Sequence, residues 1–342
     1  MGYPYPERKR LSVETDDFFE ILSSLQAEHG QQTALDMMCT YCLKSDSAYT
    51  QRIGMEFLYA NSYFHELQQL IDINKAHSDP SNRQWGRVYQ YVIDRRENGS
   101  RVEMLHQLQQ IKTKDPELKC VIEFTKAFLY LDMNHFGQVG NFLDMQPRLF
   151  SNVKDVFLLS CFHNRLNQYL FMYHWSRNEL IIARKYAFRA LTQTSSDLIK
   201  ASIHINLGLT YTFDTYQQGM YHLNAALSLA EGIGAKKVID TIKIHNIPFL
   251  SAHFGETEGI ETVDQSEQAH LEIARGNISK AIAILENSPL SNPFDLYYMG
   301  LAKRDKDLLT ASYNHFIEKQ GDLFFARLPL NAMKKLFGET IN

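Results

Sequence analysis

The residues of this chain that could carry out chemistry are few and scattered. Cys39 and Cys42 form a single CxxC pair, but a structural zinc site needs a second pair, so we interpret both as small core residues of a reduced helix. His163 and His174 share a helix face, but no carboxylates converge there, and we expect no metal. The sequence has no Gly-rich phosphate loop, HExxH, GxSxG or Rossmann fingerprint. We therefore predict a protein that is not an enzyme and has no cofactor.

Polar residues inside apolar helices are more informative. Asn164 and Asn167 lie in CFHNRLNQYLFMYHW, and Asn206 lies in SIHINLGLTY. A buried amide costs about 1–3 kcal/mol unless it is paired. Two interpretations stay open: these side chains staple neighbouring helices, or they bind the main chain of an extended peptide. Glu267 is the acid nearest the face that we expect to be concave, although acids are also favoured at a solvated helix N-terminus.

These side chains must be positioned by helices, because apolar residues recur at three- and four-residue spacing along almost the whole chain. Only 9 prolines and 17 glycines interrupt the pattern. The spacing predicts a first helix over residues 15–29 and a helix of about six turns over residues 153–175. The fold class that we expect is all-α.

The second half of the chain repeats itself. Small residues recur in the A-x3-[AF]-x2-A rhythm of the second helix of a tetratricopeptide hairpin, whose period is about 34 residues. The blocks begin at Ala183, Gly219, Ala281 and Ser312, at offsets of 36, 62 and 31 residues. The double offset leaves room for a degenerate hairpin around residues 239–254. We predict a right-handed superhelix of tetratricopeptide-like helical hairpins, whose concave face offers evenly spaced contacts to an extended ligand.

The predicted domain organisation has three parts. Residues 1–14 form a flexible tail, residues 15–150 form N-terminal degenerate helical repeats, and residues 151–342 form C-terminal tetratricopeptide-like repeats with a capping helix over 330–337. The formal net charge of −4 gives no overall attraction to nucleic acid or to an anionic membrane. A secretory signal and a long apolar span are both absent from the sequence, so we expect a cytoplasmic protein without membrane contact.

Spaced blocks of the sequence resemble one family. The blocks RLNQYLFMYHWSRNELIIARKYAFRAL, LGLTYTFDTYQQGMYHLNAALSLAEG, EQAHLEIARGNISKAIAIL and GLAKRDKDLLTASYNHFIEKQGD are similar to the arbitrium (AimR-like) receptors of Bacillus phages. These are tetratricopeptide-type quorum-sensing regulators of the Rap/PlcR group. The resemblance runs from about residue 36 to the C-terminus. It implies a homodimeric transcription factor that binds a short imported signalling peptide and so decides between lysis and lysogeny.

The resemblance also implies a peptide site on the concave side of the C-terminal repeats. Glu267 and Asp322 fall where the family places acids that face the peptide's arginine, and Phe249 falls at an apolar pocket wall. A contact between an acid and an arginine is a strong anchor for a short peptide. The predicted peptide-binding residues are Asn164, Asn167, Asn206, Phe249, Glu267 and Asp322, with Lys200, Tyr211 and Phe213 as further candidates.

The sequence departs from the family's pattern at three places. Leu209 stands where the family presents a peptide-binding asparagine, and Leu198 stands where it presents an arginine for the peptide's carboxylate. Lys200, two residues on, is the candidate substitute. The family's DNA-binding helices precede the segment where this chain begins, and residues 1–10 cannot form a helix-turn-helix. DNA contact would therefore require an N-terminal domain that is missing or truncated.

Two functional hypotheses follow. The first is a peptide-sensing transcriptional regulator of the arbitrium type, in which the bound peptide changes the conformation of a homodimer. The second is a Rap-like helical-repeat scaffold that binds another protein and has no peptide ligand. Peptide binding that depends on Glu267 would separate the two hypotheses.

Overall fold

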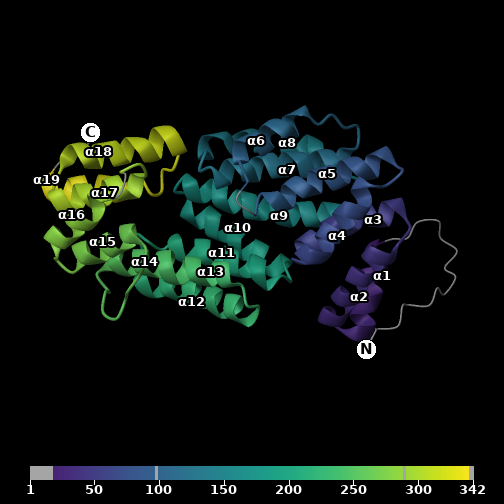
Figure 1. Cartoon of the computed structure of the whole chain (residues 1–342), viewed down its shortest axis with the longest axis horizontal. Helices are drawn as coiled ribbons and strands as arrows, with labels where there is room; N and C mark the ends of the chain where they lie inside the picture. Colours follow the sequence, from purple (N-terminus) through teal and green to yellow (C-terminus); the bar gives the residue numbers. More distant parts are fainter. Residues whose placement is uncertain (1–17, 97–98, 288–289, 339–342) are drawn as a thin grey trace. The chain divides into compact units, whose positions relative to one another are not determined.

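The computed structural model describes residues 18–96, 99–287 and 290–338 (Figure 1). These residues form helices joined by turns, and no strand occurs within the described ranges, which confirms the all-α prediction. The predicted tail over residues 1–14 lies outside them. No helix in the described part of the chain has the length and apolar character that crossing a membrane requires.

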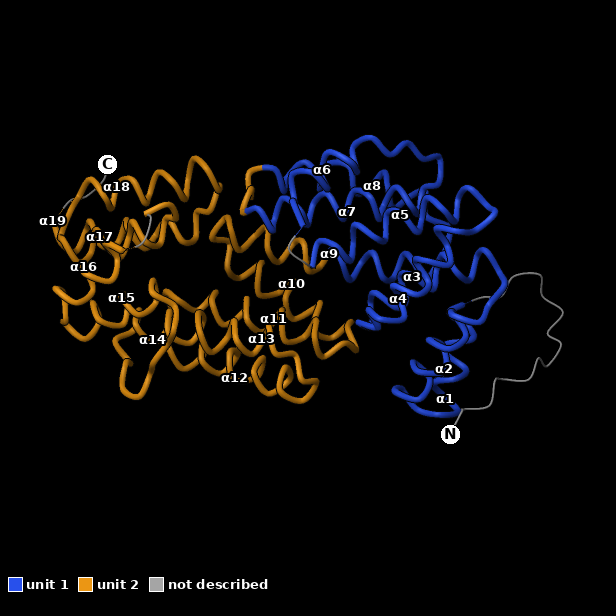
Figure 2. Tube along the Cα trace, in the orientation of Figure 1, with its two compact units in different colours: residues 1–133, 138–166 blue, residues 134–137, 167–342 orange. Residues whose placement is uncertain are grey.

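The chain divides into two compact units (Figure 2). Unit 1 comprises residues 1–133 and 138–166, and unit 2 comprises residues 134–137 and 167–342. The boundary falls within the 21-residue helix α9 (Val156–Ser176), which matches the long helix expected over residues 153–175. The predicted division between residues 150 and 151 stays a prediction.

Four helices of unit 1 begin at N-cap residues whose side chains accept a backbone N–H. Ser47, Ser100 and Asp115 each accept a hydrogen bond from the backbone N–H three residues on, and Asp79 accepts one from Ser81. The helices are α1 (Phe18–His29), α2 (Gln31–Lys44), α3 (Ala48–Ala60), α4 (Phe64–Lys75), α5 (Pro80–Asp94), α6 (Arg101–Gln110), α7 (Pro116–Asp132), α8 (Gly140–Phe150) and the first half of α9. The short η1 (Phe136–Gln138) precedes α8, and its first two residues belong to unit 2.

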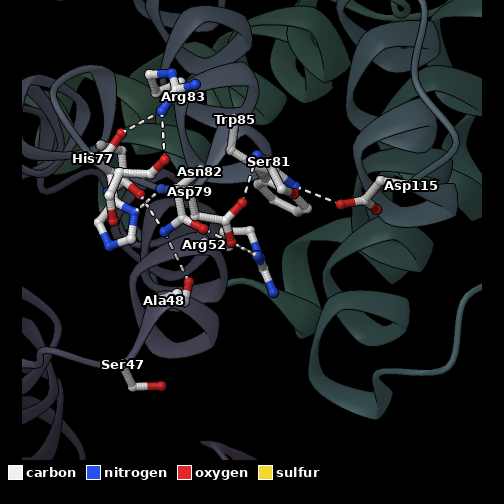
Figure 3. Close-up of polar contacts among 12 residues, drawn as sticks. Ser47, Ala48, Arg52, His77, Asp79, Ser81, Asn82, Arg83, Trp85 and Asp115 are labelled. Atoms are coloured by element: carbon white, nitrogen blue, oxygen red, sulfur yellow. Dashed lines mark hydrogen bonds and ion pairs between the residues drawn. The ribbon is translucent and has the colours of Figure 1, made fainter.

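A polar junction ties α5 to its neighbours in unit 1 (Figure 3). The amide of Asn82 is fully buried and donates to the carbonyl of Ala48 at 3.0 Å and to Asn74 at 2.8 Å. Arg52 donates to the oxygen of the same amide at 3.0 Å, and the indole N–H of Trp85 donates to Asp115 at 2.8 Å. These bonds join α3, α4, α5 and α7, and they pair polar groups that burial would otherwise penalise.

Unit 2 buries the small residues from which the repeats were predicted. Ala183, Ala187 and Ala190 of α10 are all fully buried. A Cβ atom on Gly208 would lie 2.9 Å from the carbonyl oxygen of Gly219, so α11 and α12 approach at a distance that only glycine permits. The elements are the second half of α9, then α10 (Leu180–Gln193), α11 (Asp197–Leu209), α12 (Tyr216–Gly232), α13 (Lys236–Thr241), η2 (Ile242–Asn246), α14 (Ile247–Phe254), α15 (Gln265–Ala274), α16 (Ile278–Leu285), α17 (Pro293–Lys303), α18 (Lys306–Asn314), η3 (His315–Gln320) and α19 (Arg327–Phe337).

The region of the expected degenerate hairpin differs from the prediction. Residues 236–254 form one helical run, α13–η2–α14, in which η2 is a π-helical segment. Pro248 has no N–H to give to the carbonyl of Ile244, and the hydroxyl of Thr262 donates to that carbonyl instead, at 2.6 Å. The π segment and this external donor let the helix continue past the proline.

The end of unit 2 returns to its beginning. The carbonyl of Ser176, at the end of α9, accepts the backbone N–H of Leu323 at 2.7 Å and that of Phe324 at 3.3 Å. Arg327 donates to the side chain of Asn178 at 2.9 Å. The turn after η3, which carries Asp322, is therefore held against the first helix of the unit.

Candidate functional site

Glu267 is positioned by the start of α15. Asp264 caps this helix and accepts the backbone N–H of Glu267 at 2.9 Å, which places Glu267 in the first turn. The residue is nevertheless only 8% exposed. Its Oε1 atom accepts the hydroxyl of Tyr298, from α17, at 3.0 Å. Burial and the charge of Glu267 raise the pKa of Tyr298, so this hydroxyl keeps its proton and donates.

The second carboxylate oxygen of Glu267 is left without a hydrogen bond. Its Oε2 atom is buried and lies 3.5 Å from Nδ1 of His270, one turn further along α15. Neither atom has a hydrogen-bond partner among the residues that the structure describes. The imidazole of His270 stacks on Tyr298, with ring centroids 4.2 Å apart. A buried oxygen of this kind can accept a hydrogen bond from a cationic ligand.

Aromatic rings surround this acid. The ring of Phe249, from α14, is 5% exposed and packs against His270 at 5.8 Å and edge-on against Phe325 at 5.9 Å. Phe294 packs edge-on against both phenylalanines, at 5.8 and 5.3 Å. We call this group the acid–aromatic site; it consists of Phe213, Phe249, Glu267, His270, Phe294, Tyr298, Asp322 and Phe325.

Asp322 joins the site through the turn that carries Phe325. Its Oδ1 atom accepts the backbone N–H groups of Phe324 at 3.0 Å and of Phe325 at 2.9 Å, so the carboxyl group shapes the turn. Burial raises the pKa of Asp322 to about 7, and the two N–H groups oppose this shift. At neutral pH the carboxyl group is therefore close to the midpoint of its titration.

The histidine beside the site is uncharged at neutral pH. Burial, followed by the nearby charge of His270, lowers the pKa of His253 to about 4. Its ring contacts Phe213 edge-on at 5.6 Å and stacks on Phe249 at 6.3 Å. His253 thus extends the apolar lining rather than adding a cation that would repel a positively charged ligand.

Comparison with known proteins places this architecture in a family. Residues 34–335 match the family described as AimR transcriptional regulator-like. The chain belongs to the AimR family. This confirms the resemblance inferred from the spaced blocks, and it means that the protein belongs to a family of transcriptional regulators.

Two curated phage regulators align with most of the chain. The AimR transcriptional regulator of Bacillus phage SPbeta is 22% identical over 334 residues, which cover 94% of this chain and 85% of that protein. The AimR transcriptional regulator of Bacillus phage phi3T is 22% identical over 286 residues, which cover 79% of this chain and 73% of that protein.

A solved AimR structure has the same fold. The structure described as phAimR-Ligand superposes with a TM-score of 0.78 at 20% identity and covers 94% of this chain and 98% of that one. A second structure, of SeMet-phAimR, superposes with a TM-score of 0.64 at 19% identity and covers 93% of this chain and 85% of that one. Both likenesses support the all-helical AimR fold.

Within this AimR fold, the predicted site residues separate into two groups. Phe249, Glu267 and Asp322 lie together in the acid–aromatic site. Phe213 lies there as well, edge-on to Phe324 at 5.1 Å, with the guanidinium of Arg327 4.1 Å from its ring centroid. Four of the predicted residues are therefore neighbours, although 109 positions separate the first from the last in the sequence.

Three other predicted residues make contacts elsewhere in unit 2. Asn167 donates to Gln193 at 2.7 Å, which joins α9 to α10 as the stapling interpretation expects. The ammonium group of Lys200 lies 2.9 Å from the carboxylate of Asp197, on the same helix. Tyr211 is buried and stacks on His222 at 5.6 Å, and the guanidinium of Arg184 lies over the Tyr211 ring, 3.8 Å from its centroid.

The two remaining predicted residues, Asn206 and Asn164, lie in different parts of the fold, and so does Leu209, which replaces an asparagine of the family. Asn206 is half-buried on α11, with its amide 3.5 Å from the sulfur of Met172. Asn164 belongs to unit 1 and so is not part of the site in unit 2. Leu209, which replaces the family's asparagine, packs against the apolar clusters around Phe249 and Phe171. Leu209 therefore contributes apolar contacts to these clusters.

Sequence reasoning missed several residues of the site. His270 follows Glu267 by three positions, a spacing that puts both on one helix face and could have identified it. Tyr298, Phe294 and Phe325 carry no comparable signal, because they reach the site from other helices and turns. Only the packing of unit 2 brings them to α15.

Proposed function

We propose that this chain is a peptide-sensing transcriptional regulator of the arbitrium type. A short signalling peptide binds at the acid–aromatic site of unit 2, and a cationic side chain of the peptide hydrogen-bonds Oε2 of Glu267. The peptide's apolar groups pack on Phe249 and Phe213. Asp322 provides the second acid that faces the cation.

The unpaired oxygen of Glu267 is the observation that carries this proposal. The buried carboxylate accepts one hydrogen bond from Tyr298, and its second oxygen has no donor among the described residues; an arginine offers five N–H donors in a planar fork that suits such a group. The aromatic surroundings exclude water, which strengthens a charge-assisted bond. Together these features favour a short peptide with an arginine over a neutral ligand.

Regulation follows if the peptide prefers one conformation of the receptor. A ligand shifts a conformational equilibrium only by its difference in affinity for the two states. The Asp322 turn, which is held to the carbonyl of Ser176, connects the site to α9, and we expect the peptide to stabilise one arrangement of this turn in a homodimer. Light scattering with and without peptide would measure the number of chains in the assembly.

The test is calorimetric titration with a synthetic hexapeptide that ends in Arg-Gly-Ala. Glu267→Gln keeps the shape of the side chain and removes its charge. We expect a loss of affinity of about 10- to 100-fold, because a hydrogen bond to a charged group contributes about 1.5–3 kcal/mol. Unchanged affinity in this variant would contradict the site assignment.

Glu272 provides a matched control on the same helix. It is 6% exposed, but its carboxylate is already bound by Arg275, Asn277 and Lys280. Glu272→Gln removes the same charge from α15, and we expect peptide affinity to stay within about twofold of the original, since no charge is left unpaired for a ligand. Equal losses in both variants would indicate a general charge effect rather than a contact.

A second candidate function is a scaffold that binds another protein without a peptide. It is favoured by apolar side chains exposed on α10 and α12: Ile181 is 88% exposed, Tyr221 is 68% exposed and Phe188 is 47% exposed. Exposed apolar groups that lie close together often mark protein contacts. If no hexapeptide binds and Ile181→Lys abolishes capture of a protein partner, the scaffold function is supported instead.

A further inference from the structure

The two tryptophans of the chain differ in how their indole N–H groups are paired. Trp85, in unit 1, is 1% exposed and donates to Asp115 at 2.8 Å (Figure 3). Trp175, in the last turn of α9 in unit 2, is 7% exposed. Its Nε1 atom is buried, and no acceptor for it exists within residues 18–96, 99–287 and 290–338.

An unpaired indole N–H is unusual, because buried tryptophans generally find an acceptor. The carbonyl of Ser176, the next residue, already accepts the N–H groups of Leu323 and Phe324. The ring of Trp175 instead packs edge-on against Phe324 and Phe325, both at 5.8 Å. These contacts satisfy the apolar ring and leave its one polar atom without a partner.

Trp175 lies at one end of an aromatic row whose other end is the unpaired acid. From Trp175 the row passes to Phe325 at 5.8 Å, to Phe249 at a further 5.9 Å and to His270 at a further 5.8 Å, where Glu267 Oε2 is 3.5 Å from the imidazole. The ring centroids at the two ends are thus at most about 17 Å apart, a distance that about five extended residues cover. One end offers a donor and the other offers an acceptor.

We propose that Trp175 is a second polar contact for the ligand: its indole N–H donates to a main-chain carbonyl or terminal carboxylate oxygen of the same peptide whose cation binds Glu267. The inference rests on the proposed function. It narrows the ligand to a peptide of about five or six residues that spans the aromatic row. Since the turn of Phe324 and Phe325 packs on the indole, this turn shifts when the oxygen enters.

The indole proton can be observed directly in the intact protein. With ¹⁵N-labelled tryptophan, the spectrum contains two indole signals, because the chain has two tryptophans. On titration with the hexapeptide that ends in Arg-Gly-Ala, we expect the Trp175 proton to move downfield as it gains a hydrogen bond. The Trp85 signal should stay in place, since its bond to Asp115 is already made.

Substitution gives a second and independent readout. Trp175→Phe retains an aromatic ring and removes the N–H, and we expect hexapeptide affinity to fall about tenfold, the effect of one hydrogen bond. Trp85→Phe removes the other indole N–H and should leave affinity unchanged. Trp175→Phe also identifies which of the two signals belongs to Trp175.

The outcomes distinguish this inference from the function on which it rests. If the peptide binds, but the Trp175 signal stays in place and Trp175→Phe binds as tightly as the original chain, Trp175 is not a contact and the proposed function stands. If the peptide does not bind at all, both fail.

A hexapeptide with an amidated C-terminus identifies the acceptor of the Trp175 hydrogen bond. The shift of the Trp175 signal is lost if the acceptor is the carboxylate and persists if it is a main-chain carbonyl, and either result supports the contact.

Discussion

Glu56 of unit 1 and Glu267 of unit 2 are both buried in their helices, but their carboxylates are paired to different extents. Glu56 of unit 1 is fully buried, and both of its oxygens are bound: Arg165 donates to Oε1 at 2.9 Å and to Oε2, and the hydroxyl of Tyr89 also donates to Oε2. Glu267 of unit 2 receives one hydrogen bond from Tyr298, and its other oxygen receives none from any described residue.

The two glutamates also differ in whether a cationic side chain pairs with them. Arg165 is 5% exposed and stacks over Tyr59 at 4.2 Å. Burial lowers its pKa, but the charge of Glu56, together with Tyr59, Tyr89 and the hydrogen bond to Glu56, raises the pKa overall. No lysine or arginine in the described part of unit 2 forms an ion pair with Glu267. The buried acid of unit 1 is therefore bound within the unit, whereas the acid of unit 2 keeps one oxygen without a donor among the described residues, as the proposed peptide site requires.

The largest expected effect comes from making the same substitution in both units. Glu56→Gln leaves the buried guanidinium of Arg165 without its counter-charge, and we expect a loss of about 3–5 kcal/mol in the unfolding free energy of unit 1. Glu267→Gln removes a charge that is only partly compensated, so the stability of unit 2 should stay within about 1 kcal/mol or increase.

Urea denaturation measures both effects, because each unit contains one tryptophan. Emission from Trp85 in a Trp175→Phe background follows unit 1, and emission from Trp175 in a Trp85→Phe background follows unit 2. Equal destabilisation by the two glutamine variants would remove the distinction between a structural and a ligand-binding acid.

A second prediction concerns Asp322, another buried acid of unit 2. Burial raises its pKa from 3.8 to about 7, so below pH 4 the carboxyl group is protonated in both the folded and the unfolded chain. Between about pH 4 and 7 the unfolded chain releases the proton while the folded unit retains it. The unfolding free energy of unit 2 should therefore fall as the pH rises, by up to about 4 kcal/mol.

Asp322→Asn isolates this effect. The asparagine oxygen can accept the same two N–H groups but does not titrate. As the pH rises from about 4 to 7, the unfolding free energy of the original unit should therefore fall relative to that of the variant, and outside this range the difference should stay constant. His222 and His253, whose pKa values burial lowers to about 4, lower stability as the pH falls, and they do so in both proteins. Identical pH profiles would show that Asp322 is not the titrating group.

A smaller effect is expected from the close helix pair of unit 2. In Gly208→Ala the new methyl group would lie 2.9 Å from the backbone oxygen of Gly219, and we expect a loss of about 1–3 kcal/mol because α11 and α12 must separate. Gly232→Ala, at the end of α12, has no atom within 4 Å and should be neutral or stabilise by up to about 1 kcal/mol. If thermal unfolding shows the same shift in melting temperature for both variants, the steric explanation of the close approach of α11 and α12 is contradicted.

The fold was largely predictable because its signals are local. Helical periodicity and the buried Ala183, Ala187 and Ala190 depend on spacings of three and four residues, which an α-helix converts directly into one packed face. The run over residues 236–254 was not predictable in this way. Its continuity past Pro248 depends on Thr262, a residue from another segment.

The site could be predicted only in part. The resemblance to the AimR family led to Phe249, Glu267 and Asp322, which the structure brings together. The asparagines were ambiguous from sequence, because an amide that staples helices and an amide that binds a peptide occur in the same kind of helix. Asn167 bonds to Gln193 across a helix pair, and this contact is a property of packing.

The sequence by itself determined that the chain forms helices and where they cross closely, because these properties depend on residues within one or two turns of each other; the candidate acids came from the resemblance to the family. Only the tertiary structure decided which buried polar groups are paired. Glu56 pairs with Arg165, 109 positions away, whereas Glu267 and Trp175 each have one polar atom that no described residue pairs. The reason is physical: a hydrogen bond needs its partner within about 3 Å, and only the packing of distant helices determines whether one is there.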